Sequence, residues 1–117
     1  MISVGQGKYK VWLKKEKLDN GLVLVIGGGE FSHVGSVVLS EFRVSRTGKG
    51  FSCTSQIINI LGHKEEDIAR QFAEKTCVKI RKPVVCVCGI HIENATKEDI
   101  KILMSNAKKL LKIFSEK

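Results

Sequence analysis

The stretch Val84-Val85-Cys86-Val87-Cys88-Gly89-Ile90 decides the fold of this chain. It is an uninterrupted run of β-branched and small apolar residues that begins directly after Pro83. Such a run is typical of a strand that is covered on both faces, so it predicts a central strand of a sheet. The run is also far too short to cross a bilayer, which takes ~20 apolar residues.

Amphipathic helices are predicted on both sides of this strand. Before it, residues 64–82 repeat apolar side chains at the i, i+3, i+4 spacing, with acidic residues in the first turn and basic residues in the last. Pro83 ends that helix. After the strand, Thr96-Lys97-Glu98-Asp99 resembles a capping box and starts a helix that runs to about Phe114. Its long apolar stripe faces either its own core or a second subunit.

The first half of the chain predicts strands. Residues 9–17 alternate weakly, Asp19-Asn20-Gly21 is a hairpin signal, and an apolar strand, Leu22 to Ile26, follows and ends at a glycine run. We expect that strand to be covered on both faces. A third strand, His33 to Val44, is predicted to return beside the second and complete an antiparallel meander. The segment from Phe51 to Leu61 fits a strand or a helical turn equally well, with its isoleucines buried.

The order of these elements predicts the fold class. Strands come first, then a helix, the apolar strand and a second helix, in 117 residues with a single proline and no linker. Hydrophobic residues make up 43% and charged residues 27%, as in an ordered globular domain. We therefore predict one α+β domain over residues 1–117, in which two helices pack on one face of a mixed or antiparallel sheet.

The chain is basic, with 20 Lys and Arg against 12 Asp and Glu and a formal net charge of +8. Such an excess can attract nucleic acid, an anionic membrane or a phosphorylated ligand. The basic residues are spread along the chain without an Arg-rich block or an aromatic stripe, which argues against nucleic acid. No charged-then-apolar leader opens the sequence, so we expect a cytoplasmic protein with reduced thiols. Cys86 and Cys88 share one face of the strand and are predicted to pack in the core.

The three histidines each lie where a predicted element begins or ends, close to a glycine. His33 follows the glycine run, His63 begins the first helix and His91 ends the apolar strand. Neutral imidazole is the commonest metal ligand in proteins. Carboxylates near them in sequence, which can act as ligands or orient the imidazoles, are Glu30, Glu66 and Glu93. No His-x-x-x-His spacing is present, so three unrelated histidines is an alternative that stays open.

The run Gly27-Gly28-Gly29 lies between strands and is not followed by Gly-Lys-Ser/Thr. Phosphate loops of nucleotide triphosphatases lead into a helix, so that class is disfavoured. A wide turn and contact of the backbone with an anion both remain open.

Three segments carry a resemblance to a known family: Gly28-Gly29-Glu30-Phe31-Ser32-His33-Val34-Gly35, His63-Lys64-Glu65-Glu66 and Gly89-Ile90-His91-Ile92-Glu93-Asn94-Ala95-Thr96. Together, and in this order, they resemble the small D subunit of gallate-type decarboxylases, a family described as prenylated-flavin chaperones. The similarity spans the chain from about Leu22 to Phe114. One departure is Phe31-Ser32, where we expect a proline near the histidine, and this bears on the shape of the loop.

The resemblance implies an accessory protein rather than an enzyme, with a fold like that of proteasome-assembly-chaperone domains. It implies binding of prenylated FMN with a divalent metal ion, a homodimer, and assistance to a partner decarboxylase that uses this cofactor. The cofactor-binding residues expected in this chain are Gly28, Gly29, His33, Gly35, Arg43, His63, His91 and Asn94. The expected metal ligands are His33, His63, His91, Glu30 and Glu93. Arg43, with Arg46, is chosen on chemical grounds because arginine pairs well with phosphate.

Two other classes of function stay open. The same histidines would serve a metal-dependent enzyme. A structural assembly chaperone without a small ligand would instead dock its partner through a sheet edge or a helix face.

Overall fold

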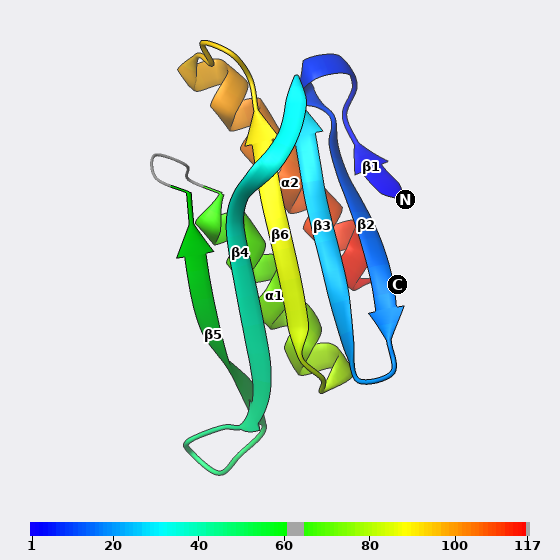
Figure 1. Ribbon diagram of the computed structural model, residues 1–117, viewed down its shortest axis with the longest axis vertical. Helices are drawn as coiled ribbons and strands as arrows, with labels where there is room; N and C mark the ends of the chain where they lie inside the picture. Colours follow the sequence, from blue (N-terminus) through cyan, green and yellow to red (C-terminus); the bar gives the residue numbers. More distant parts are fainter. Residues whose placement is uncertain (61–64, 117) are drawn as a thin grey trace.

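The computed structural model describes residues 1–60 and 65–116, and it shows a single sheet with two α-helices on one of its faces (Figure 1). The strands are β1 (Ile2–Val4), β2 (Val11–Leu18), β3 (Gly21–Gly29), β4 (Phe31–Val44), β5 (Phe51–Asn59) and β6 (Val84–His91). The helices are α1 (Glu66–Ile80) and α2 (Lys97–Ser115), with a short 3-10 helix, η1 (Gly7–Tyr9). The predicted α+β class, mixed sheet and one-sided helix layer are confirmed.

The strand order is β1-β2-β3-β6-β4-β5, so the apolar run that forms β6 is central as predicted. β6 pairs in parallel with β3, from Leu22↔Val84 to Gly29↔His91, and antiparallel with β4. The predicted meander is therefore wrong in one respect: β4 does not return beside β3, because β6 is inserted between them. A strand as apolar as β6 needs a hydrogen-bonded neighbour on each edge, and this long-range requirement overrides adjacency in sequence.

The core lies between the sheet and the helices. On α1 the predicted apolar stripe is buried except for the half-buried Ile80. On α2 the stripe is buried or half-buried along its length, although Ile100 at its start is exposed. Cys77, Cys86 and Cys88 are buried in this layer as free thiols, and burial raises the pKa of the Cys86 thiol to about 12. The cysteines of the central strand thus pack as small apolar residues, as predicted. Neither helix has the length and apolar character that crossing a membrane requires.

The segment that was ambiguous in the sequence is an edge strand, β5, which pairs only with β4. Ile58 is 70% exposed and Ile60 is 51% exposed, so the expectation that the isoleucines are buried is wrong. An edge strand has a neighbour on one side only, and half of its side chains point away from the helices. Leu61, the last residue of that expectation, lies outside the described residues.

The sheet face opposite the helices is also apolar. Side chains alternate along a strand, and the positions between the buried ones are half-buried. They are Val23 and Val25 on β3, Val85 and Val87 on β6, and Val37 and Leu39 on β4. None of the helices and strands in the described part of the chain covers this open face. The predicted strand Leu22 to Ile26 is therefore covered on one face rather than on both.

Candidate functional site

The structure brings two of the three histidines together at one end of the sheet. Phe31, at the start of β4, pairs with His91, at the end of β6. The ring centroids of His33 and His91 are 6.0 Å apart at an interplanar angle of 88°. The Phe31 ring lies 4.4 Å from that of His91 and 6.1 Å from that of His33, and Phe31 is 52% exposed. We call these three side chains the ring cluster.

Glycines allow the strands to approach closely enough to form this cluster. The carbonyl oxygen of His33 lies where a Cβ on Gly89 would be, and the carbonyl oxygen of His91 lies where a Cβ on Gly29 would be. The register of β4 against β6 shifts between Ser32 and Ser36, and His33 lies within this irregular segment of β4. The Glu30 N–H then donates to the His91 carbonyl at 2.7 Å. The close approach of these backbone segments therefore fixes the position of both histidines.

The glycines predicted to contact a cofactor are packed against the protein itself. A Cβ on Gly28 would overlap the Lys10 carbonyl oxygen, and a Cβ on Gly35 would lie 2.8 Å from Glu65 Oε2. This close packing accounts for glycine at these positions. A direct contact between them and a cofactor stays a prediction.

Each histidine of the ring cluster lies against a carboxylate. His33 Nε2 is 3.2 Å from Glu65 Oε1, and His91 Nε2 is 3.1 Å from Glu93 Oε2. Glu65 is only 7% exposed, and the Ile90 N–H is 3.4 Å from the same Oε1. With its proton on Nε2, the His91 imidazole donates to Glu93, which holds that ring in one orientation and one tautomer. The close contact with the buried Glu65 carboxylate holds the His33 ring in place.

Two members of this site were missed in the sequence. The sequence pattern accounts for Glu65 as an acidic residue at the start of the helix, where it complements the macrodipole. The signal that could have found it is its place in the segment with His63 that carries the family resemblance. Phe31 was noted only as a departure from the expected pattern, although its ring packs on His91.

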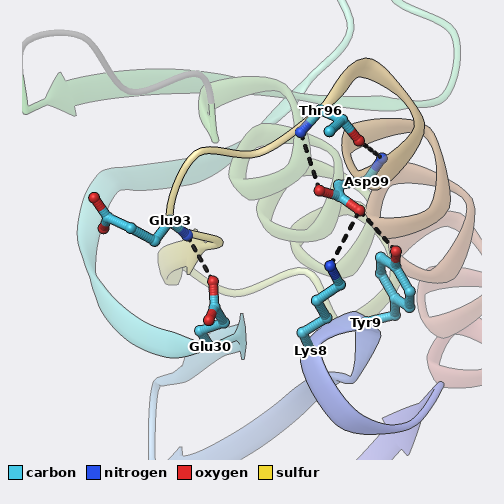
Figure 2. A network of polar contacts seen from close by, with 6 residues as sticks. All are labelled: Lys8, Tyr9, Glu30, Glu93, Thr96 and Asp99. Carbon is cyan, nitrogen blue, oxygen red and sulfur yellow. Dashed lines mark hydrogen bonds and ion pairs between the residues drawn. The ribbon is translucent and has the colours of Figure 1, made fainter.

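A network of polar contacts fixes the loop that follows His91 (Figure 2). At the start of the loop, the Glu93 N–H donates to Glu30 Oε1 at 2.7 Å. At its end, Thr96 and Asp99 form the predicted capping box of α2, with both hydrogen bonds at 3.0 Å. The Tyr9 hydroxyl donates to Asp99 at 2.7 Å, which ties α2 to η1. The loop is thereby anchored at both ends.

Asp99 is the electrostatic centre of this network. The backbone N–H of Thr96 and the hydroxyl of Tyr9 both donate to its carboxylate, and they lower the pKa of Asp99 to about 2. In turn, the negative charge of Asp99, 3.6 Å from Lys8 Nζ, raises the pKa of Lys8. The contacts of the folded protein therefore stabilise the ionised form of Asp99.

The other predicted site residues do not all meet at the ring cluster. Asn94 lies in the anchored loop, exposed and with a positive φ of 52°. Arg43 lies at the opposite end of β4, where it donates to Thr54 Oγ1 and the Val44 carbonyl. It lies ten positions along the strand from His33, roughly 30 Å, and Arg46 follows in the next loop. His63 lies outside the described residues, so its predicted role stays a prediction.

The predicted metal ligands that the structure describes do not by themselves make a metal site. His33, His91 and Glu93 offer suitable donor atoms, while Glu30 Oε1 already accepts the Glu93 N–H. Across residues 1–60 and 65–116, no group of three or more His, Cys, Asp or Glu side chains is placed to hold a metal ion.

The chain matches the model of a known protein family. A family model described as the prenylated flavin chaperone LpdD-like domain matches residues 5–117. The match covers almost the whole chain, including both strands of the ring cluster and the anchored loop. No curated protein matches the chain.

The pKa of Asp99 predicts a specific dependence of stability on pH. Because the folded pKa is about 2 and the unfolded pKa is ~3.9, ionised Asp99 stabilises the fold above pH ~4, and this contribution is lost as the pH falls towards 2. Asp99→Asn should therefore lower the urea midpoint at pH 7, and the difference from wild type should shrink at pH 2.5. A difference that is equal at both pH values would contradict the assignment.

The backbone crossing at Gly89 predicts a second outcome. Gly89→Ala places a methyl group on the His33 carbonyl oxygen, so we expect a loss of about 1–3 kcal/mol in the free energy of unfolding. The backbone amide resonance of His33 should move as β4 shifts. Gly50→Ala is the control, because no atom lies within 4 Å of that Cβ and only its positive φ of 73° opposes the change. An unchanged His33 resonance in Gly89→Ala would refute the close approach.

Proposed function

Since the chain belongs to the family of LpdD-like prenylated flavin chaperones, we propose that it binds prenylated FMN at the ring cluster and passes it to a partner decarboxylase. The observation that carries this proposal is the exposed Phe31 ring packed 4.4 Å from His91. The chain is then an accessory protein, which needs to hold the cofactor and release it but not to perform acid–base chemistry on it.

The ring cluster suits the tricyclic part of a flavin. Planar aromatic systems pack in offset or edge-to-face arrangements on aromatic side chains, and such contacts add to the free energy of burying the rings. Phe31 presents one exposed face at the end of the sheet, and its packing on His91 fixes it before a ligand arrives. Fixing a contact surface in advance lowers the conformational entropy lost on binding.

The two histidines suit the polar parts of the same ligand. Imidazoles that are oriented by Glu65 and Glu93 present their remaining ring atoms in a defined direction. Histidine can donate or accept a hydrogen bond, so it can contact either the polar edge of a flavin or its phosphate. A predicted pairing of Arg43 with the phosphate is not part of this proposal, because Arg43 lies at the other end of β4.

Substitution of the ring cluster tests the proposal. In a spectrophotometric titration with prenylated FMN, Phe31→Ala and His91→Ala should each weaken binding by up to roughly tenfold, the value of one lost aromatic contact. The matched control is Phe51→Ala, which removes another exposed phenylalanine at the far end of the sheet, where it packs on Phe42. Unchanged affinity in both cluster variants, or an equal loss in Phe51→Ala, would refute the site.

We further propose that the chain forms a homodimer through the open face of the sheet. That face carries half-buried valine and leucine side chains on its three central strands, including Val87 on β6 and Leu39 on β4. Two such faces can pack on one another as in a β-sandwich. Contiguous apolar surface that a monomer leaves exposed commonly marks an interface. The ring cluster lies at one end of β6, so the cofactor would sit near the edge of this interface.

The dimer has a direct test. Val87→Glu places a charge in the middle of the open face, and in size-exclusion chromatography with light scattering it should convert dimer to monomer. Ile113→Glu is the control, since it makes the same change at a partly exposed apolar position on α2. A wild-type monomer at micromolar concentration, or a Val87→Glu dimer, would contradict the proposal.

A further inference from the structure

A concave surface lies at the opposite end of the sheet from the ring cluster. It has a volume of about 490 Å³ and lies where the β2–β3 hairpin meets the C-terminal ends of α1 and α2. In the β3–β6 pair, the Leu22↔Val84 end borders it, whereas the Gly29↔His91 end carries the ring cluster. Seven strand residues separate the two ends, roughly 23 Å. The proposed function makes no use of this surface, which we call the basic groove.

The floor of the basic groove is apolar because the helix layer leaves a corner of the sheet uncovered. Along β2, Val11 and Leu13 are buried, but the next two positions on the same face are Lys15 and Lys17, which are exposed. The apolar lining comes from three strands and two helices: Ile2, Leu18, Leu22, Ile80, Leu111 and Phe114. Leu18 is 53% exposed, so this floor is open to a ligand.

The walls of the groove are strongly basic. Five of its lining residues are lysines: Lys15, Lys17, Lys75, Lys79 and Lys82. Within the described part of the chain, no Asp or Glu lines it. These lysines contribute part of the net charge of +8, and they create a positive electrostatic potential above the apolar floor of the groove.

The lysines divide into two groups. Lys79 Nζ donates to the Ser115 carbonyl at 2.8 Å, and Lys82 Nζ donates to the Asp19 carbonyl at 3.3 Å. These two lysines therefore stabilise the fold through hydrogen bonds to the backbone. The contact of Lys79 also offsets the partial negative charge at the C-terminus of α2, which would repel an anion. Among the described residues, Lys15, Lys17 and Lys75 have no hydrogen-bond or ion-pair partner.

We propose that the basic groove binds an anionic amphiphile, with its alkyl chain on the apolar floor and its carboxylate or phosphate between Lys15, Lys17 and Lys75. The volume falls in the ~300–1,000 Å³ range of small-molecule sites. A docked partner helix would need a trough long enough for side chains at i, i+3, i+4 and i+7. The groove is instead a corner enclosed by a hairpin and two helix ends. The proposal is independent of flavin binding at the ring cluster.

Calorimetric titration with three ligands of equal chain length tests the charge requirement. Decanoate and decyl phosphate, below their micelle concentrations, should each bind saturably at one per chain, and decyl glucoside should bind at least tenfold more weakly. The tighter of the two anions identifies the head group. Binding of the anions should weaken with added salt, because the lysines are exposed. Equal affinity for the uncharged glucoside, or no binding of either anion, would overturn the proposal.

Variants locate the binding in the groove. Lys15→Glu and Lys75→Glu should each weaken anion binding by roughly fivefold or more, because an attractive charge becomes a repulsive one. Leu18→Ser, at an exposed position of the floor, should weaken it as well. Lys101→Glu makes the same charge change on an exposed part of α2 outside the groove and should leave the affinity unchanged. An equal loss of affinity in Lys101→Glu would overturn the proposal. So would a wild-type chain that binds neither decanoate nor decyl phosphate but binds an acidic amphipathic peptide saturably.

Discussion

The close crossing of β4 over β6 is the constraint on which the histidine end of the molecule depends. The His33 carbonyl occupies the space that a side chain on Gly89 would take, and the His91 carbonyl does the same at Gly29. These two contacts let strands from distant parts of the sequence place Phe31, His33 and His91 within one cluster of rings. Glu65 and Glu93 then orient the imidazoles, and the capping box of α2 anchors the loop beyond them.

The two ends of the sheet have different chemistry. At the histidine end, aromatic rings and carboxylates surround a small exposed surface that suits a planar, polar cofactor. At the other end, lysines line an apolar corner from which, in the described residues, acidic side chains are absent. The basic residues are spread over many segments of the sequence. The fold brings some of them together at this corner. Under the two proposals, one end of the sheet binds the cofactor and the other binds a different ligand.

Local patterns in the sequence predicted what depends on local physics. The apolar run of β6, the two helices and the hairpin at Asp19-Asn20-Gly21 are set by periodicity, capping and turn chemistry. The insertion of β6 between β3 and β4 could not be predicted in this way, because the choice of strand partner depends on burial across the whole sheet. The exposed isoleucines of β5 were misjudged for a related reason: nothing in the sequence marks an edge strand.

The site was predictable in outline only. His33 and His91 meet because each lies at the same end of neighbouring strands, which their positions at element ends suggested. Glu65 was hidden because an acidic residue at a helix start has an ordinary explanation. Arg43 is predicted from its chemistry alone, and it lies ten positions along β4 from His33. Chemical suitability thus carries no information on where in the fold a residue lies, and a contact of Arg43 with the cofactor stays a prediction.

The most direct test of the central claim is a pair of ¹H–¹⁵N correlation spectra of the labelled chain, with and without prenylated FMN. Binding at the ring cluster predicts the largest chemical-shift changes in residues 28–35 and 89–95, with little change in residues 43–51 at the far end of β4. Large changes confined to the far end, or none in the two cluster segments when the cofactor is bound, would contradict the account.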